Sequence, residues 1–221
     1  METLGQIRHP NLVPLLGFCF LEREKLLIYK NMPNGALPLR LRSGCESFGW
    51  QKRLRAALGV ARGLAWLHHG FQTPLTHGSL NTSAVLLDED DEPRIADFGL
   101  NRLFSTSTSS ATSEDVYQFG MLLLKLVTDG TEMESGDEEL ADGVVRLLAA
   151  GWVGEAIDPC LRRTGNEDEI VELLTIGCRC LVARAEERPS MFQVFKWLER
   201  IGGRVEIHEE FDEFPLRYGC E

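Results

Sequence analysis

Hydrophobic positions divide the chain into a short strand-like region followed by a longer helical region. Two apolar runs, Leu12–Phe20 and Lys25–Lys30, are separated by the charged residues LERE, a pattern typical of an antiparallel hairpin. Residues 1–9 are expected to end a helix, because a helix does not continue through Pro10. The sequence Met32–Gly35 predicts a turn, since its Pro fixes φ and its Asn-Gly pair tolerates positive φ.

The helical region contains one helix of unusual composition. Residues 115–128 are apolar on almost every face, so they predict a helix in the middle of a domain rather than on its surface. Between Trp50 and His69 apolar residues recur every three or four positions, which predicts an amphipathic helix that ends at Gly70. The remaining expected elements are helices near 138–150, 167–182 and 190–201 and a small hairpin joining 85–88 to 94–95.

Composition narrows the classes of partner. The 221 residues carry 23 basic and 34 acidic side chains, a net charge of −11, which disfavours nucleic acid and anionic lipid as partners. No run of about 18 apolar residues occurs, so we expect no membrane insertion. The first ten residues lack the apolar core of a secretory signal, so a cytoplasmic chain is expected. The six cysteines have no zinc-like spacing, and we expect reduced thiols rather than metal ligands.

Five phrases carry a family resemblance by occurring in one order along the chain. They are HPNLVPLLG at 9–17, HGSLNTSAVLLD at 77–88, ADFGL at 96–100, DVYQFG at 115–120 and ERPSM at 187–191. With them the chain resembles the eukaryotic protein kinases, and in particular the plant leucine-rich-repeat receptor-like kinases. The phrases LLIYKNMPNG, GLAWLHHG and FDEFPL are similar to those of inactive members that bind co-receptor kinases.

The resemblance covers about residues 1–218 and is weakest over 100–114. It implies an α+β, protein-kinase-like fold. In that fold residues 1–35 would be a remnant of the N-lobe with the hinge, 36–201 the helical C-lobe, and 202–221 an acidic C-terminal tail. A strand over 25–30 would have an unpaired edge, so it is expected to lean on the helical lobe or to be paired by another chain.

The catalytic loop departs from the family pattern. Active kinases carry H-R-D-L-x-x-x-N, and the resemblance aligns His77 with the histidine but Gly78, Ser79 and Ala84 with the arginine, the base aspartate and the metal-binding asparagine. Serine does not accept a proton near neutral pH, and alanine offers no oxygen to Mg²⁺. The glycine-rich loop and β3 lysine, which would precede Met1, are absent from this sequence. We therefore expect no catalytic residue.

The nucleotide-side positions are also incomplete. The resemblance makes Tyr29 the gatekeeper, places Lys30, Asn31 and Met32 in the hinge, and gives Asp97 the role of a Mg²⁺ ligand. A single carboxylate binds a magnesium–nucleotide complex poorly, so a turn-capping role for Asp97 is favoured. Mg-ATP is implied by family resemblance only, and we expect no cofactor.

Three residues are expected to be structural. The resemblance implies that His77 packs beneath the DFG turn and that the Asp115 carboxylate accepts backbone N–H groups of the catalytic loop. Only 15 residues, Leu100–Glu114, separate Gly99 from Asp115, and no A-P-E phrase occurs. Arg188, which pairs with the glutamate of that phrase in the family, is therefore expected to face water or to find another carboxylate.

Two competing interpretations concern individual residues. Ser79 and His77 could form a hydrolase pair, which the absence of a nucleophile elbow disfavours. The serine- and threonine-rich residues 105–113 could be phosphorylated by another kinase, although a solvated loop is the favoured interpretation.

The leading function is that of a catalytically inactive pseudokinase that acts in signalling by binding another receptor-like protein kinase. The family resemblance places such a protein at the cytoplasmic face of the plasma membrane. A weakly active ATP-dependent serine/threonine protein kinase is one alternative, and a truncated gene product without a function of its own is the other.

Overall fold

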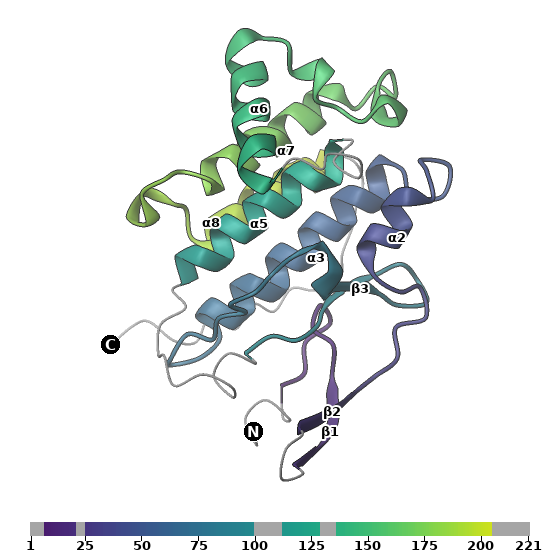
Figure 1. The fold of residues 1–221 in the computed structure, drawn as a ribbon, viewed down its shortest axis with the longest axis vertical. Helices are drawn as coiled ribbons and strands as arrows, with labels where there is room; N and C mark the ends of the chain where they lie inside the picture. The colour runs from purple at the N-terminus through teal and green to yellow at the C-terminus, as the bar shows by residue number, and fades with distance from the viewer. Residues whose placement is uncertain (1–6, 21–24, 100–111, 129–135, 205–221) are drawn as a thin grey trace.

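The computed structural model describes residues 7–20, 25–99, 112–128 and 136–204. Long helices form the body of the molecule, and two small two-stranded sheets lie at one end of it (Figure 1). The elements in chain order are β1 Leu15–Phe20, β2 Lys25–Tyr29, α2 Leu37–Arg42, α3 Trp50–His69, η1 Thr82–Ala84, β3 Val85–Leu87, β4 Pro93–Ile95, α5 Thr112–Val127, α6 Asp137–Ala150, η2 Val153–Glu155, η3 Pro159–Leu161, α7 Glu167–Cys180, η4 Ala185–Glu187 and α8 Met191–Arg204.

Helices α3 and α5 form the centre of the hydrophobic core. Helix α8 packs along α3, and α7 packs along α5. The large apolar side chains of α5, among them Phe119, Leu123 and Leu126, are completely buried. The prediction that residues 115–128 form a helix in the middle of the domain is therefore confirmed. The helix predicted between Trp50 and His69 matches α3 at both ends.

The crossing of α5 and α7 depends on two glycines. A Cβ added to Gly120 would lie 2.8 Å from the Cβ of Cys180 and 2.9 Å from the carbonyl oxygen of Gly177, and one added to Gly177 would lie 2.6 Å from Leu124 Cδ1. These separations are shorter than carbon contacts allow, so only glycine lets the two backbones approach this closely.

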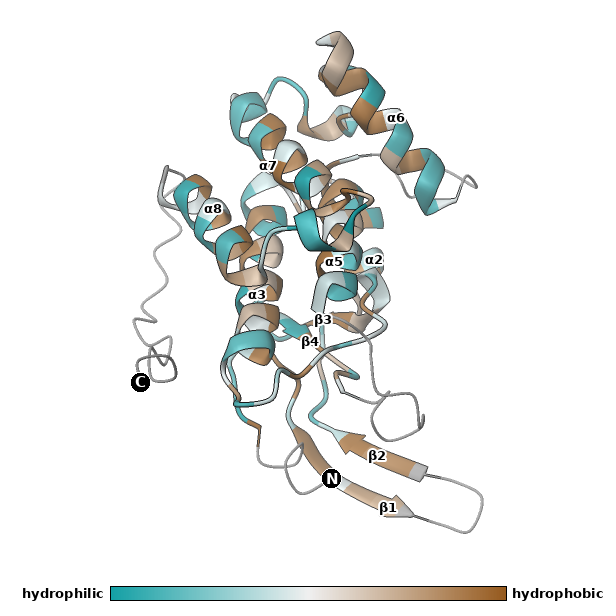
Figure 2. Cartoon of the chain, turned by 90° about the vertical axis from the view of Figure 1, so that its left-hand side faces the viewer, coloured by the Kyte–Doolittle hydropathy of each residue, from teal (hydrophilic) through white to brown (hydrophobic). Residues whose placement is uncertain are grey.

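The expected hairpins are both confirmed. Strands β1 and β2 pair antiparallel from Leu15↔Tyr29 to Phe20↔Lys25, and β3 pairs antiparallel with β4. The β1–β2 hairpin is apolar yet extends away from the helical body (Figure 2). Four of its large apolar side chains are exposed: Leu16, Phe18, Leu26 and Ile28.

Some expectations fall at the margins of the described residues. Ile7–His9 are not helical, and the rest of the helix expected over 1–9 lies outside the described residues. Most of the serine-rich run also lies outside them, although Thr112 and Ser113 begin α5. The expected tail from residue 202 starts within α8, and its residues 205–221 are not described. No helix in the described part has the length and apolar character needed to cross a bilayer.

The expectation that every cysteine is a reduced thiol is wrong for one pair. Cys45, in the loop between α2 and α3, is joined by a disulfide to Cys160 in η3, although 115 residues separate them. Cys178 and Cys180 are free thiols, as expected. No local spacing marks the bonded pair, because the folded lobe and not the sequence brings the two segments together.

Candidate functional site

The loop that begins at His77 is held by the first turn of helix α5. The Asp115 carboxylate, which is completely buried, accepts hydrogen bonds from the backbone N–H of His77 (2.8 Å) and of Gly78 (2.7 Å). Its Oδ2 also lies 2.9 Å from Nε2 of His68 on α3. An acidic residue in the first turn is favoured by the helix dipole, so the same carboxylate supports the helix and fixes the loop.

A second side chain of α5 extends this attachment. Gln118 Oε1 accepts a hydrogen bond from the backbone N–H of Leu80 at 2.7 Å. Sequence reasoning missed this residue. The signal was present, because Gln118 is three positions after Asp115 and such residues share one face of a helix.

His77 is buried beneath the segment that leads to Asp97. Its Nδ1 accepts the backbone N–H of Ser79 (3.3 Å), so its Nε2 carries the proton and donates to the carbonyl oxygen of Ala96 (2.9 Å). Burial lowers the pKa of His77, and the nearby Asp115 carboxylate offsets this only in part. Both ring nitrogens of His77 are engaged by backbone groups and neither contacts the Ser79 hydroxyl, so this geometry disfavours the hydrolase interpretation.

The remaining loop positions carry small side chains. Gly78 has a φ of +83°, in the left-handed region that favours glycine. Ser79 is exposed, whereas Ala84 is buried and its carbonyl oxygen accepts the N–H of Ala96 at 2.8 Å. The backbone of the loop is therefore ordered by hydrogen bonds at both ends. The side chains that the family resemblance aligns with the base aspartate and the metal-binding asparagine are a hydroxyl and a methyl group.

Two of the expected nucleotide-side residues meet directly. The hydroxyl of Tyr29, at the end of β2, donates a hydrogen bond to the Asp97 carboxylate. Burial raises the pKa of Tyr29 to about 12, and the charge and hydrogen bond of Asp97 add to the effect. Met32 packs nearby in a small buried cluster with Val13 and Ala96.

The two other hinge residues do not converge on this contact. Lys30 and Asn31 are exposed. Asp97 itself has a φ of +58°, an uncommon conformation for a residue with a side chain.

These residues do not fit a magnesium–nucleotide complex. Ala84 has no side-chain oxygen at the position that the family resemblance aligns with the metal-binding asparagine, so Asp97 would be the single carboxylate of the site. Mg²⁺ requires several oxygen ligands in a regular arrangement and gives up water reluctantly. We therefore derive no phosphoryl-transfer step for this site.

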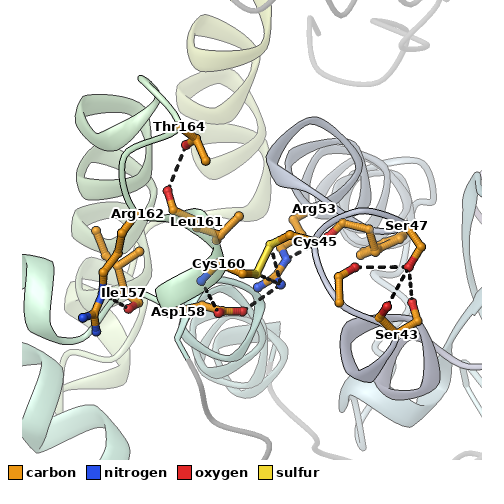
Figure 3. Close-up of a disulfide and its surroundings, with 12 residues drawn as sticks. Ser43, Cys45, Ser47, Arg53, Ile157, Asp158, Cys160, Leu161, Arg162 and Thr164 are labelled. Carbon is orange, nitrogen blue, oxygen red and sulfur yellow. Dashed lines mark hydrogen bonds and ion pairs between the residues drawn. A yellow bond between two sulfur atoms is a disulfide. The ribbon is translucent and has the colours of Figure 1, made fainter.

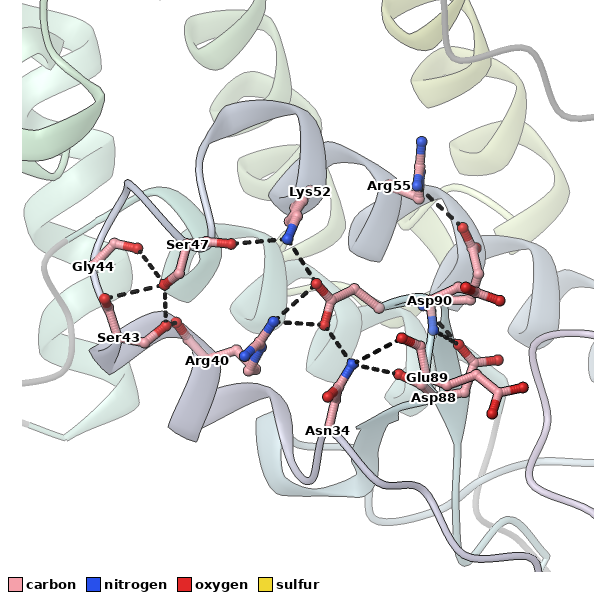
Figure 4. Close-up of polar contacts among 12 residues, drawn as sticks. Asn34, Arg40, Ser43, Gly44, Ser47, Lys52, Arg55, Asp88, Glu89 and Asp90 are labelled. Carbon is pink, nitrogen blue, oxygen red and sulfur yellow. Dashed lines mark hydrogen bonds and ion pairs between the residues drawn. The ribbon is translucent and has the colours of Figure 1, made fainter.

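A polar network ties the turn after β2 to the helical lobe (Figure 4). Asn34 donates to the carbonyl oxygen of Asp88 (2.7 Å) and to Oδ1 of Asp91 (2.9 Å). The Asp91 carboxylate also pairs with Arg40 of α2 (2.8 Å) and Lys52 of α3 (2.7 Å). This network fixes the hinge against the β3–β4 turn, which precedes Asp97 in the chain.

Arg188, which follows η4, packs against the first turns of α5. Its Nε donates to the carbonyl oxygen of Val182 (2.8 Å) and its Nη1 to that of Ser113 (2.9 Å). Its guanidinium also lies over the ring of Tyr117, at 4.9 Å. The Glu114 carboxylate is 3.9 Å away. Arg188 therefore finds another carboxylate, as expected, although its shorter contacts are to backbone carbonyl oxygens.

A hollow of about 250 Å³ lies on the other side of the loop, between Leu80 and the α5 residues Tyr117 and Met121. Neither Tyr29 nor Asp97 lines it. This hollow is therefore not a nucleotide cleft.

Comparisons with known proteins agree with this geometry. The family model described as protein tyrosine and serine/threonine kinase matches residues 1–115. Over 98% of its length the chain is 38% identical to an Arabidopsis thaliana protein named a probable inactive receptor kinase, and 41% identical to one named a probable LRR receptor-like serine/threonine-protein kinase. The chain spans 42% and 41% of the lengths of these two relatives.

A solved structure is also similar. It is the pseudokinase domain of BIR2, described as an immune regulator of the RLK/Pelle family. The two share 38% identity with a TM-score of 0.84, over 94% of this chain and 70% of the other. The kinase-like fold expected from the sequence is thereby confirmed. The chain belongs to the protein tyrosine and serine/threonine kinase family, among relatives that are plant leucine-rich-repeat receptor-like kinases.

Proposed function

We propose that this chain is the pseudokinase domain of a receptor-like kinase, which acts in signalling by binding another receptor-like protein kinase and does not transfer phosphate. One observation carries the proposal. Asp115 and Gln118 hold the backbone of the catalytic loop in place, while Ser79 and Ala84 stand at its base and metal positions.

Phosphoryl transfer makes two physical demands on a protein. Such catalysis depends on placing charges around the phosphates, and general-base help contributes roughly 10²–10⁴-fold. Neither contribution is available from a serine hydroxyl and a methyl group. Asp97 is then the single carboxylate left on the metal side, and one carboxylate binds a magnesium–nucleotide complex poorly.

A phosphate-transfer assay with radiolabelled ATP tests the inactive half of the proposal. The purified chain is compared with its Asp97→Asn variant, which removes the one carboxylate left on the metal side. We expect the two to give the same background with Mg²⁺ or Mn²⁺, for the chain itself and for added protein substrates. Incorporation that the variant abolishes would show a weakly active kinase and would contradict the proposal.

A binding assay tests the other half. Active kinase domains of plant leucine-rich-repeat receptor-like kinases are titrated against the immobilised chain without nucleotide. We expect saturable, equimolar binding to at least one of them, unchanged by Asp97→Asn because that residue acts in no chemistry here. Failure to bind across such a panel, by a chain that melts cooperatively, would contradict the binding role. We place the complex at the cytoplasmic face of the plasma membrane, where receptor-like kinases act.

A further inference from the structure

A second chemical site lies far from the catalytic loop, where the disulfide joins two distant segments (Figure 3). Cys45 precedes α3, and Cys160 is in η3, after α6. Their Cα atoms are 5.8 Å apart, within the range that a disulfide spans without movement of the backbone. The fold itself therefore brings these two sulfurs together.

A buried cation is fixed beside both sulfurs. Nη2 of Arg53 lies 3.5 Å from Sγ of Cys160 and 3.7 Å from Sγ of Cys45. Nε of the same guanidinium donates to the carbonyl oxygen of Phe48 (3.1 Å) and Nη1 to that of Leu126 (2.8 Å). These bonds hold the charge in place whether or not the sulfurs are joined.

One carboxylate shares this guanidinium. Asp158 Oδ2 pairs with Nη2 of Arg53 at 2.8 Å, while its Oδ1 accepts the backbone N–H of Cys160 at 3.0 Å. The carboxylate thus orients the charge and the Cys160 backbone together. A neighbouring cation favours the thiolate, which is the nucleophilic form of cysteine.

The pair is accessible, unlike the other cysteines of the helical lobe. Cys160 is exposed and Cys45 is half-buried. Burial raises the pKa of Cys178, and burial together with Cys178 raises the pKa of Cys180 to about 12. Cys160 is therefore open to a reagent in solvent, whereas burial disfavours the thiolate form of Cys178 and Cys180.

Cys45, Asp158 and Cys160 together offer ligand atoms for a metal ion, but the positive charge of Arg53 beside them disfavours metal binding. The ligand atoms of Cys45, Asp158 and Cys160 all lie within 4.8 Å of one another. A divalent cation among them would meet the guanidinium of Arg53, which contacts all three residues. Oxidation of the thiols leaves that contact intact, whereas metal binding would expel it.

We propose that Cys45 and Cys160 form a peroxide-responsive redox switch. The Cys160 thiolate attacks one oxygen of hydrogen peroxide; the O–O bond breaks, giving a sulfenic acid and a hydroxide ion that is protonated to water. The Cys45 thiol then attacks the sulfenic sulfur, the disulfide forms and a second water leaves. Two thiols lose two electrons to one peroxide, and thiol–disulfide exchange with glutathione or a dithiol reverses the reaction.

The bond controls how firmly the segment containing α6 is held. Helix α6 buries only Leu140 and Val144, and η3 is attached to the end of α5 through the backbone bond from Asp158 N–H to the carbonyl oxygen of Val127 (2.8 Å). The disulfide adds a covalent tie from η3 to the loop before α3. Reduction removes this covalent tie and leaves the segment held by non-covalent contacts alone, among them the Asp158–Arg53 ion pair. This inference does not depend on the proposed function.

The test follows the bond and its effect in the whole chain. Reduced protein is treated with hydrogen peroxide, digested without reductant and analysed by mass spectrometry, with Cys19→Ser as the matched control because Cys19 is exposed on β1. We expect a Cys45–Cys160 linked peptide in both proteins and its loss in Cys160→Ser. The oxidised chain should melt about 10 °C above the reduced one, and Cys45→Ser should melt like the reduced chain under both conditions.

Two further readouts separate the switch from a structural bond or a metal site. Reduced Cys160 should react with iodoacetamide at least tenfold faster than Cys19 at pH 7, and amides of α6 should exchange faster after reduction. The proposal is overturned if oxidation links other cysteines, if the two forms melt alike, or if the reduced chain binds one equivalent of Zn²⁺ that is lost in Cys45→Ser.

Discussion

The helix α5 and the β1–β2 hairpin are similarly apolar in sequence, but the fold treats them in opposite ways. The large apolar side chains of α5 are buried between α3 and α7. In the hairpin, Leu16 is 62% exposed and Ile28 is 55% exposed. Burial of a large apolar side chain contributes roughly 1.5–3 kcal/mol, so nearly all of this stabilisation lies in the helical lobe.

The catalytic loop repeats this contrast on a smaller scale. Asp115 and His77, which hold the loop, are buried and fully hydrogen-bonded. Ser79, at the base position, is exposed. A buried charge that ties two segments supports the fold directly, whereas an exposed side chain used only for chemistry does not. The contrast explains how a kinase-like lobe can keep its shape when the exposed side chains of this loop are replaced.

Among the polar contacts, the largest effect is expected where Asp115 of α5 holds the loop. Asp115→Ala removes the acceptor for two backbone N–H groups and the partner of His68, and it should lower the free energy of unfolding by about 3 kcal/mol. Chemical denaturation measures this loss. The exposed Asp142→Ala on α6 is the control and should change the same quantity by less than about 0.5 kcal/mol. Equal effects of the two substitutions would contradict the role assigned to Asp115.

The helix crossing provides the next test. Gly120→Ala places a methyl group against the Gly177 carbonyl and the Cys180 side chain, so it should lower the free energy of unfolding by about 2 kcal/mol. The matched change Gly143→Ala on α6 meets no atom within 4 Å and should raise stability by about 0.5–1 kcal/mol through helix propensity. Thermal unfolding of both variants checks the pair, and a stabilising Gly120→Ala would contradict the close packing.

Acid should weaken the fold through two histidines. Burial lowers the pKa of His77, and burial with the charges of Arg62 and Arg94 lowers the pKa of His9 to about 4. Below pH 6.5 the unfolded chain therefore binds protons that the folded chain does not, and stability falls as the pH falls. His9→Gln should recover about 1 kcal/mol of the loss between pH 7 and 5.5. The same pH dependence in the variant and the parent chain would rule out this contribution.

The smallest effect is expected in the hairpin. Ile28→Thr keeps the β-branched shape but removes apolar surface that is already in contact with water, so it should change the free energy of unfolding by less than about 0.5 kcal/mol. Leu123→Ala in α5 is the contrasting change and should cost about 2–5 kcal/mol. Denaturant titrations compare them, and a large loss from Ile28→Thr would show that the hairpin face is covered.

Local patterns were sufficient to predict most helices and both hairpins. Helix α3 is long and has a clear apolar period, and α5 is apolar on almost every face. Each hairpin consists of two short apolar runs separated by charged residues. The six-residue α2 was missed, since a short helix offers too few positions for a period to show. The helix expected before Pro10 was wrong for Ile7–His9. A proline can end a helix, but it does not show that a helix precedes it.

The site was predictable only where the family resemblance implies the interaction. Asp115 could be linked to the loop through family resemblance, but the Tyr29–Asp97 hydrogen bond and the Cys45–Cys160 disulfide join residues 68 and 115 positions apart. Such contacts depend on how the lobe packs, and no periodicity or spacing within either segment encodes them.

The most direct test of an intact lobe without nucleotide chemistry is thermal unfolding with and without millimolar Mg-ATP. A ligand that binds the folded state raises its melting temperature according to its concentration and affinity. We expect one cooperative transition whose midpoint is the same in both conditions. A midpoint that rises with Mg-ATP concentration and no longer does so in Asp97→Asn would contradict it.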